Sequence, residues 1–316
     1  MRKKLGKALF FLSTNSRITT KELGKLIRSS QQSASYLIKQ LKKKRVIKGY
    51  VTIVDPIKLG FNNLLVGLNF LSFDKDVREG VLEILKQTNA IISIQEASLG
   101  VDLVVEYCTP NLSAFNKTHS EITNKLYRSI ETKFIFPIVV KHKYNRDYLI
   151  NKSTERDIVL CGDRQVNILS DAETKVLQEL LEHPDATLNS ISKATGTSLK
   201  TVVNIKKKLE KLFIIRGYGC VINHSALGFN RFLVLLKLSS QGVGEINRLT
   251  EYCLRHKNII ELIKIIGDYH VVLVVENARE SNIIQELRSN FFIEDYELIE
   301  IESVNKEYYL PRNIYE

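Results

Sequence analysis

The chain has 316 residues, of which 44% are hydrophobic and 26% are charged, and its formal net charge is +11. These values are typical of a globular protein with two or more domains and exclude a disordered chain. No apolar run approaches the roughly 18–20 residues of a membrane span, so we expect no membrane attachment. The four cysteines are far apart and show no metal-ligand spacing. We therefore expect a cytoplasmic protein without a structural metal or a cofactor.

The positive charge is concentrated in the first fifty residues. Residues 1–50 hold fourteen Lys or Arg side chains and one acid, Glu22, so this segment alone has a net charge of +13. Clustered Lys and Arg side chains gain free energy by displacing the counterions of a phosphate backbone. The segment therefore indicates a polyanionic partner, and the alternative is a solvated face that favours solubility.

Three helices are predicted in this segment. Thr19 or Thr20 is positioned to cap the second helix, and Ser30 is positioned to cap the third, because their hydroxyls can accept first-turn amides. Residues Val46–Val54 follow with strand character, and Gly49 suits a tight hairpin turn. Residues 1–55 are therefore predicted to form a winged helix-turn-helix.

The next part of the chain alternates between the strand and helix periods. The predicted elements are strand Leu64–Phe70, helix Asp76–Gln87, strands Ile91–Ala97 and Leu103–Tyr107, helix Leu112–Tyr127 and strand Phe134–Lys141. This βαββαβ order predicts a ferredoxin-like domain over residues 62–142. Residues 143–166 lack periodicity and are predicted to be a linker.

The remaining residues repeat this pattern at an offset of 168 positions. Ile47-Lys48-Gly49-Tyr50 recurs as Ile215-Arg216-Gly217-Tyr218, and Leu59-Gly60-Phe61-Asn62 recurs as Leu227-Gly228-Phe229-Asn230. A second winged helix-turn-helix is predicted over 167–223 and a second ferredoxin-like domain over 230–310, whose helices are expected at Val243–His256 and Arg279–Asn290. The expected fold class is α+β, with two tandem copies of one two-domain unit.

The sequence resembles the leucine-responsive/asparagine-synthetase regulator (Lrp/AsnC) family in both halves. The resemblance is carried by Arg17-Ile18 with Glu22-Leu23, by Leu41 to Tyr50, and by Asp55-Pro56-Ile57-Lys58-Leu59-Gly60-Phe61. It implies a transcription regulator that binds double-stranded DNA, with an α/β domain that binds a small effector such as an amino acid. Because family members usually have one copy, the duplication implies a pseudo-dimer within one chain, and a homodimer of whole chains remains open.

A helix-turn-helix places the start of its third helix in the major groove. Residues expected to contact bases are Gln31, Gln32, Ser35, Tyr36 and Lys39 in the first copy and Lys200, Thr201 and Asn204 in the second. Residues expected to neutralise phosphates are Lys42, Lys43, Lys44, Arg45, Lys48 and Lys207. The second copy carries more acid, so the first is expected to provide most of the DNA affinity.

The resemblance also indicates an effector loop between the second and third strands of each α/β domain. Gly267 would allow close backbone approach, Asp268 would pair with an ammonium group, and His270 would form a hydrogen bond with the effector. Gly100 and Asp102 form a shorter equivalent in the first copy. The alternative is a plain turn between strands.

Two other functions remain open at this point. One is an architectural DNA-binding protein without sequence preference. The other, less favoured, is an enzyme similar to siroheme decarboxylases, because the stretch around His224 faintly resembles their hinge segment. His224 occupies the position of Pro56 in the first copy and is expected on the surface. The balance favours a sequence-specific regulator that is not an enzyme.

Overall fold

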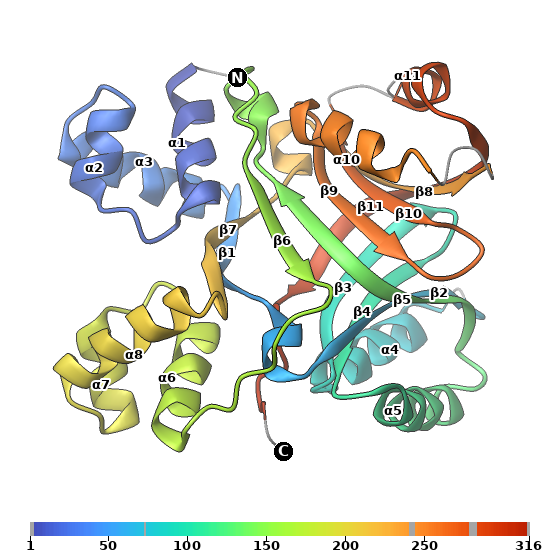
Figure 1. Cartoon of the computed structure of the whole chain (residues 1–316), viewed down its shortest axis with the longest axis horizontal. Helices are drawn as coiled ribbons and strands as arrows, with labels where there is room; N and C mark the ends of the chain where they lie inside the picture. Colours follow the sequence, from blue (N-terminus) through green and yellow to red (C-terminus); the bar gives the residue numbers. More distant parts are fainter. Residues whose placement is uncertain (1–2, 73, 240–243, 278–282, 315–316) are drawn as a thin grey trace.

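The structure is a computed structural model that describes residues 3–72, 74–239, 244–277 and 283–314. Two three-helix units lie on one side of the molecule, and a closed β-structure flanked by helices lies on the other (Figure 1). A short two-stranded sheet lies between the two sides. The expected fold class, α+β with two copies of one unit, is confirmed.

The first three-helix unit contains α1 (Lys3–Thr14), α2 (Thr20–Leu26) and α3 (Gln31–Lys43). Thr19 caps α2 in a reciprocal capping box with Glu22, and the Ser30 hydroxyl accepts the Ser33 amide at the start of α3. Both caps agree with the sequence-based expectation. Apolar side chains from all three helices meet in one core cluster.

The second unit contains α6 (Asp171–Glu182), α7 (Leu188–Thr195) and α8 (Leu199–Lys211). Ser170, Thr187 and Ser198 cap these helices. Gly196 ends α7 with φ of +64°, a left-handed conformation that favours glycine. The duplicated sequence thus produces two similar helical units.

The expected hairpin in each winged domain is wrong. Residues Ile47–Val54 form one continuous strand, β1, and Ile215–Ile222 form its counterpart, β7. The two strands pair with each other in antiparallel fashion, with Tyr50 opposite Cys220. Each strand packs on both helical units: Cys220 and Ile222 of β7 join Ile47 of β1 in the core of the first unit, and most apolar residues of β1 join Ile215 and Tyr218 of β7 in the core of the second. Both segments are strands as their periodicity predicts, but periodicity does not identify the partner strand.

The β-structure is built from both α/β halves. The first half contributes a 3₁₀ turn η1 (Pro56–Leu59), β2 (Asn62–Phe70), α4 (Lys75–Gln87), β3 (Ile91–Leu99), β4 (Leu103–Thr109), α5 (Leu112–Lys125) and β5 (Ile130–Tyr144). The second contributes η3 (Ser225–Leu227), β8 (Asn230–Leu238), α10 (Ile246–Arg255), β9 (Ile259–Ile265), β10 (Val271–Asn277), α11 (Ile283–Asn290) and β11 (Ile293–Glu307). The starts expected for the last two helices, Val243 and Arg279, lie outside the described residues.

Two long strands join the halves. β5 pairs with β2 of its own half and with β9 of the other, and β11 pairs with β8 and with β3. The strand order β2-β4-β3-β11-β8-β10-β9-β5 closes on itself because β5 also pairs with β2. An apolar cluster with residues from both halves fills the interior. The shared strands explain why β5 and β11 are longer than their apolar patterns suggested.

Residues 143–166, expected to be a linker, contain regular structure. β5 extends to Tyr144, a 3₁₀ turn η2 spans Asp147–Leu149, and β6 (Asp157–Cys161) pairs with the end of β5. The His142 ring lies 2.8 Å from the Asp157 carboxylate. A short edge strand of mixed polarity has no two-residue hydrophobic period, so β6 could not be predicted from periodicity.

Candidate nucleic-acid interface and buried charge cluster

The start of α3 forms an open hollow on the surface of the first helical unit. Gln31, Gln32, Ser35, Tyr36 and Lys39 line it together with Thr20 and Ser30, and no carboxylate is among these lining residues. Tyr36 is 65% exposed although its ring is large and apolar. The five expected base-contacting residues therefore lie on one exposed face, whose only charged side chain among them is Lys39.

The phosphate-contacting residues expected behind this face divide into two groups. Lys43, Lys44 and Arg45 are exposed at the end of α3. Lys42 lies 3.4 Å from Asp185 of the second unit, and Lys48 donates a hydrogen bond to the Val304 carbonyl of β11 at 3.3 Å. Lys42 and Lys48 thus already have contacts within the protein.

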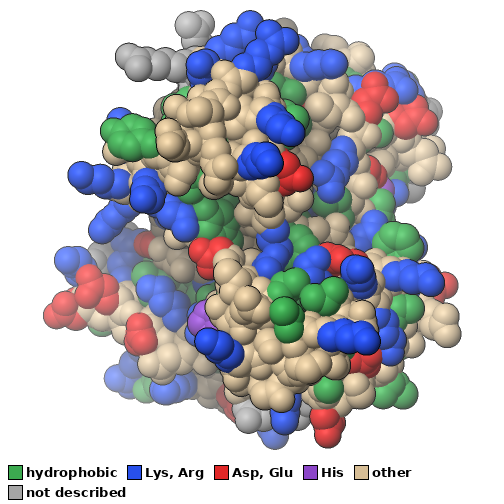
Figure 2. All heavy atoms as spheres, turned by 90° about the vertical axis from the view of Figure 1, so that its left-hand side faces the viewer, with side chains coloured by type: hydrophobic (Ala, Val, Ile, Leu, Met, Phe, Trp, Pro, Cys, Tyr) green, Lys and Arg blue, Asp and Glu red, His purple; other side chains and the backbone are tan. Residues whose placement is uncertain are grey.

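The second unit presents a similar helix with a different charge balance. Lys200, Thr201, Asn204 and Lys207 are exposed on α8. Lys206 pairs with Glu210 at 2.6 Å, and Lys208 pairs with Glu173 at 2.5 Å. Figure 2 shows Lys and Arg side chains gathered over the upper, first unit and mixed with acidic side chains over the lower, second unit. Part of the positive charge of α8 is therefore neutralised internally.

The two helical units are held together directly. The Arg17 guanidinium donates hydrogen bonds to the Pro184 and Ala186 carbonyls, at 2.7 and 2.8 Å, and lies over the Tyr218 ring. The Thr52 hydroxyl of β1 donates to the Leu180 carbonyl of α6. These contacts, added to the β1–β7 pairing, fix the position of α3 relative to α8.

The expected effector loops lie between strands, as their sequence positions indicated. Gly267 has φ of +157°, and a Cβ at this position would lie 2.4 Å from the Phe136 ring. Gly100 has φ of +84°, and its Cβ would lie 2.9 Å from Ile299. The space beside each glycine, expected to admit an effector, is thus filled by a side chain of the protein itself, Phe136 at Gly267 and Ile299 at Gly100.

The polar residues of the loops have unequal availability. The Asp102 carboxylate accepts the Phe70 amide at 2.8 Å, and the His270 ring accepts the Leu238 amide at 3.0 Å. Asp268 is exposed. Of the polar groups expected to bind the effector, Asp102 and His270 therefore accept backbone amides of neighbouring strands, and Asp268 is exposed to solvent.

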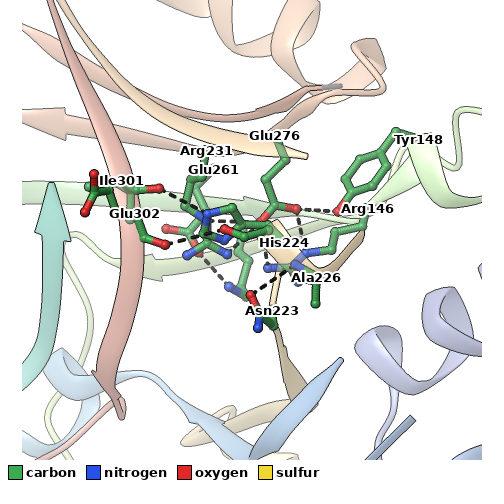
Figure 3. Close-up of polar contacts among 12 residues, drawn as sticks. Arg146, Tyr148, Asn223, His224, Ala226, Arg231, Glu261, Glu276, Ile301 and Glu302 are labelled. Carbon is green, nitrogen blue, oxygen red and sulfur yellow. Dashed lines mark hydrogen bonds and ion pairs between the residues drawn. The ribbon is translucent and has the colours of Figure 1, made fainter. Parts of the chain in front are cut away.

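A buried charge cluster lies where β8, β10 and the 143–166 segment meet (Figure 3). Glu276, fully buried, accepts hydrogen bonds from Arg146 at 2.9 Å, Arg231 at 2.6 Å and the Tyr148 hydroxyl at 2.5 Å. Burial alone would raise the pKa of the Glu276 carboxyl, but Arg146 and Arg231 lower it below its ordinary value. The carboxylate is therefore ionised and pairs with two buried guanidinium groups at once.

His224 borders this cluster and is not on the surface as expected. Its side chain is 2% exposed, and its Nε2 atom lies 3.1 Å from the Ile301 carbonyl oxygen. Burial, together with the nearby Arg231, lowers the pKa of the imidazole to about 4. The ring is thus neutral and donates to the Ile301 carbonyl of β11.

Sequence reasoning missed this cluster, although the repeat contained a sign of it. At the 168-residue offset Arg231 corresponds to Asn63 and Glu276 to Cys108. When an acidic and a basic residue replace uncharged residues at the ends of two apolar strands in one copy only, a buried ion pair is indicated. In the first copy Asn63 instead donates to Glu106, which pairs with Lys141 at 2.7 Å.

Neither a membrane-spanning helix nor a metal-binding group was found in the described ranges. No helix there has both the length and the apolarity needed to cross a bilayer. No group of three or more His, Cys, Asp or Glu side chains there is arranged to hold a metal ion.

Comparisons with known proteins give sequence relatives for about a third of the chain. No protein-family model matches the chain. An HTH-type transcriptional regulator of Pyrococcus furiosus is 30% identical over 106 residues, which are 33% of this chain and 68% of that protein. The HTH-type transcriptional regulator FL11 of the same organism is 28% identical over 118 residues, 36% of this chain and 76% of the relative.

A solved structure matches both copies together. The siroheme decarboxylase NirDL covers 98% of this chain and 94% of its own, with a TM-score of 0.59 and 12% sequence identity. At this identity the match shows a shared fold over the full duplicated length. The sequence relatives, in contrast, are HTH-type transcriptional regulators that align with about a third of this chain. The chain therefore belongs to the Lrp/AsnC family of helix-turn-helix transcriptional regulators, in a tandem-duplicated form.

Proposed function

We propose that the chain regulates transcription by binding double-stranded DNA mainly through α3 of the first helical unit. The exposed face of Gln31, Gln32, Ser35, Tyr36 and Lys39 carries this proposal. Glutamine can form a bidentate contact with adenine in the major groove, and the exposed lysines at the end of α3 can neutralise flanking phosphates.

The second unit contributes less affinity in this proposal. Its lysines Lys206 and Lys208 would have to leave Glu210 and Glu173 before they could neutralise phosphates. Lys200, Thr201 and Asn204 are exposed and available for base contacts. One chain would then read two half-sites, one tightly and one weakly, as a pseudo-dimer in the cytoplasm.

Charge substitution distinguishes the two units. Replacing Lys43 and Lys44 with Met should lower DNA affinity at least tenfold at about 0.1 M salt and reduce the slope of log K against log salt by up to about 1.8. Replacing Lys206 and Lys208 with Met, a matched pair on α8, should change affinity less than threefold. Fluorescence anisotropy across a salt series measures both quantities, and equal losses from the two pairs would contradict the proposed asymmetry.

Selection from randomised duplex DNA tests sequence specificity. Recovery of a motif with two spaced half-sites is expected, and Gln31→Ala should relax the preference at one position of the stronger half-site. Salt-dependent binding without a motif would favour the architectural alternative instead.

The enzyme alternative has less support from this chain's own residues. The structure of NirDL in complex with an iron-uroporphyrin III analogue is similar to this chain, with a TM-score of 0.57. The histidine of the hinge segment, His224, is buried here and donates to a backbone carbonyl. We therefore propose that the chain has no enzymatic activity. A coloured tetrapyrrole that copurified with the protein would argue against this proposal.

An amino-acid effector remains part of the proposal. Asp268 is exposed beside Tyr269 and is suited to pair with the ammonium group of an amino acid. Its neighbour Gly267 is closed off by Phe136, so an effector there would bind at the surface. Calorimetric titration with each of the common amino acids, with Asp268→Asn as the variant that should lose binding, tests this site.

A further inference from the structure

A separate groove lies at the junction of the helical pair and the α/β half. Its volume is about 670 Å³, within the range of small-molecule sites. One wall comes from β1, β7 and α6, and the other comes from α4, the end of β11 and the residues that follow it. It shares no lining residue with the hollow at α3.

Four cationic side chains line this groove: Lys48, Lys86, Lys306 and Arg312. Among the described residues, none of the four forms an ion pair with a carboxylate. Lys48 donates to the Val304 carbonyl, and Lys306 donates to the carbonyls of Lys86 and Thr88 at 3.0 and 3.1 Å. Arg312 donates to the Tyr308 hydroxyl. Three of the four side chains are thus held in place by neutral hydrogen-bond acceptors.

The acids that line the groove, Glu83, Glu182 and Glu307, offset these charges only in part, since three negative charges stand against four positive ones. Glu83 accepts a hydrogen bond from Gln87, and Glu182 is exposed on α6. Burial would lower the pKa of Lys143 within the β-structure, but Glu261 and, less strongly, Glu307 raise it. Burial and the nearby Arg312 lower the pKa of Lys306 to about 8. A partly buried ammonium group without a counter-ion is destabilising unless an anion occupies the space beside it.

We propose that this groove binds a small anion with at least two negative charges, carried by carboxylate or phosphate groups. Lys306 and Lys48 would contact it from opposite walls, and Lys86 and Arg312 would contact it from the rim. Such a ligand bridges the strands that carry the helical units and the α/β half. It would therefore favour one position of the helical pair, and the resulting effect on DNA affinity rests on the proposed function.

Calorimetry on the full chain at pH 7 tests binding without DNA. Citrate and pyrophosphate are the two probes, with sodium chloride added to match ionic strength. Saturable binding of at least one probe with one site per chain is expected, and the stronger probe identifies the carboxylate or the phosphate class. Lys86→Met with Arg312→Met, both exposed, should weaken binding at least tenfold, and Lys306→Met should do the same.

Two controls locate the site. Lys43→Met with Lys44→Met removes the same charge from α3 and should leave probe affinity within twofold. Lys306→Arg keeps the charge and should retain binding. No binding of either probe, or a loss that follows the α3 pair and spares the groove variants, would overturn the proposal.

The pH dependence gives a further readout. Raising the pH from 7 to 9 deprotonates Lys306, so probe affinity should fall by at least threefold in the wild type and stay level in Lys306→Arg. The charged groups that face Lys306 are Lys48 of β1, Glu83 and Lys86 of α4, Glu182 of α6, Glu307 of β11 and Arg312. Citrate and pyrophosphate gain rather than lose negative charge over this range, so the probes themselves do not cause a fall in affinity. An equal fall in both proteins would therefore count against Lys306 as a ligand. Anion binding with unchanged DNA affinity would refute only the coupling.

Discussion

At the scale of the residue, His224 makes stability depend on pH. Its pKa is about 4 in the folded chain and about 6.5 when unfolded, so the unfolded state binds the proton first as the pH falls. The stability that neutral His224 provides is complete above pH 6.5 and is lost progressively toward pH 4, by about 2–3 kcal/mol. Urea unfolding at pH 7 and pH 5 should show a steeper decline in the wild type than in His224→Gln. His183→Gln, an exposed control, should leave the wild-type profile unchanged.

How well the role of a single residue could be predicted from the sequence depended on where its partners lie. Thr19 and Ser30 were identified as caps because capping depends on a few adjacent residues. His224 was expected on the surface and Glu276 was not singled out, because their burial depends on strands from other parts of the chain. The hydroxyls have local partners, whereas the partners of the histidine and the glutamate are remote in sequence.

At the scale of the element, the turn between β9 and β10 packs against β5. Gly267→Ala places a methyl group against Phe136, so we expect a loss of about 1–3 kcal/mol of folding stability. Phe136→Ala makes room for the methyl group but costs about 3–5 kcal/mol on its own. The double variant should therefore lose less than the sum of the single losses. Additive losses in chemical denaturation would show that the ring does not fill this space.

The elements themselves were largely predictable. Helices α3, α4 and α5 begin within a residue or so of the expected positions, because each has a hydrophobic period and a cap. The hairpins were wrong, and the second pairings of β5 and β11 were not anticipated. Periodicity indicates which face of a strand is buried, but it carries no information about which strand lies beside it.

At the scale of the whole molecule, Arg17 links the two DNA-binding units. Arg17→Lys keeps the charge but cannot donate to both Pro184 and Ala186 in the same fork geometry. We expect three- to tenfold weaker binding to a duplex with both half-sites and unchanged binding to a duplex with only the stronger one. Gel-shift titrations with the two duplexes measure this difference, and an equal loss on both would indicate that Arg17 contacts DNA directly.

The pairing of β1 with β7, and of each long strand with the opposite half, joins two copies that belong to one chain. Two separate subunits must first associate, so their pair disappears on dilution and operator occupancy rises steeply with protein concentration. Here the pair persists at any dilution. Occupancy of an operator by a single chain should therefore rise with the first power of concentration, and the regulated gene would respond in a graded manner to small changes in the amount of protein.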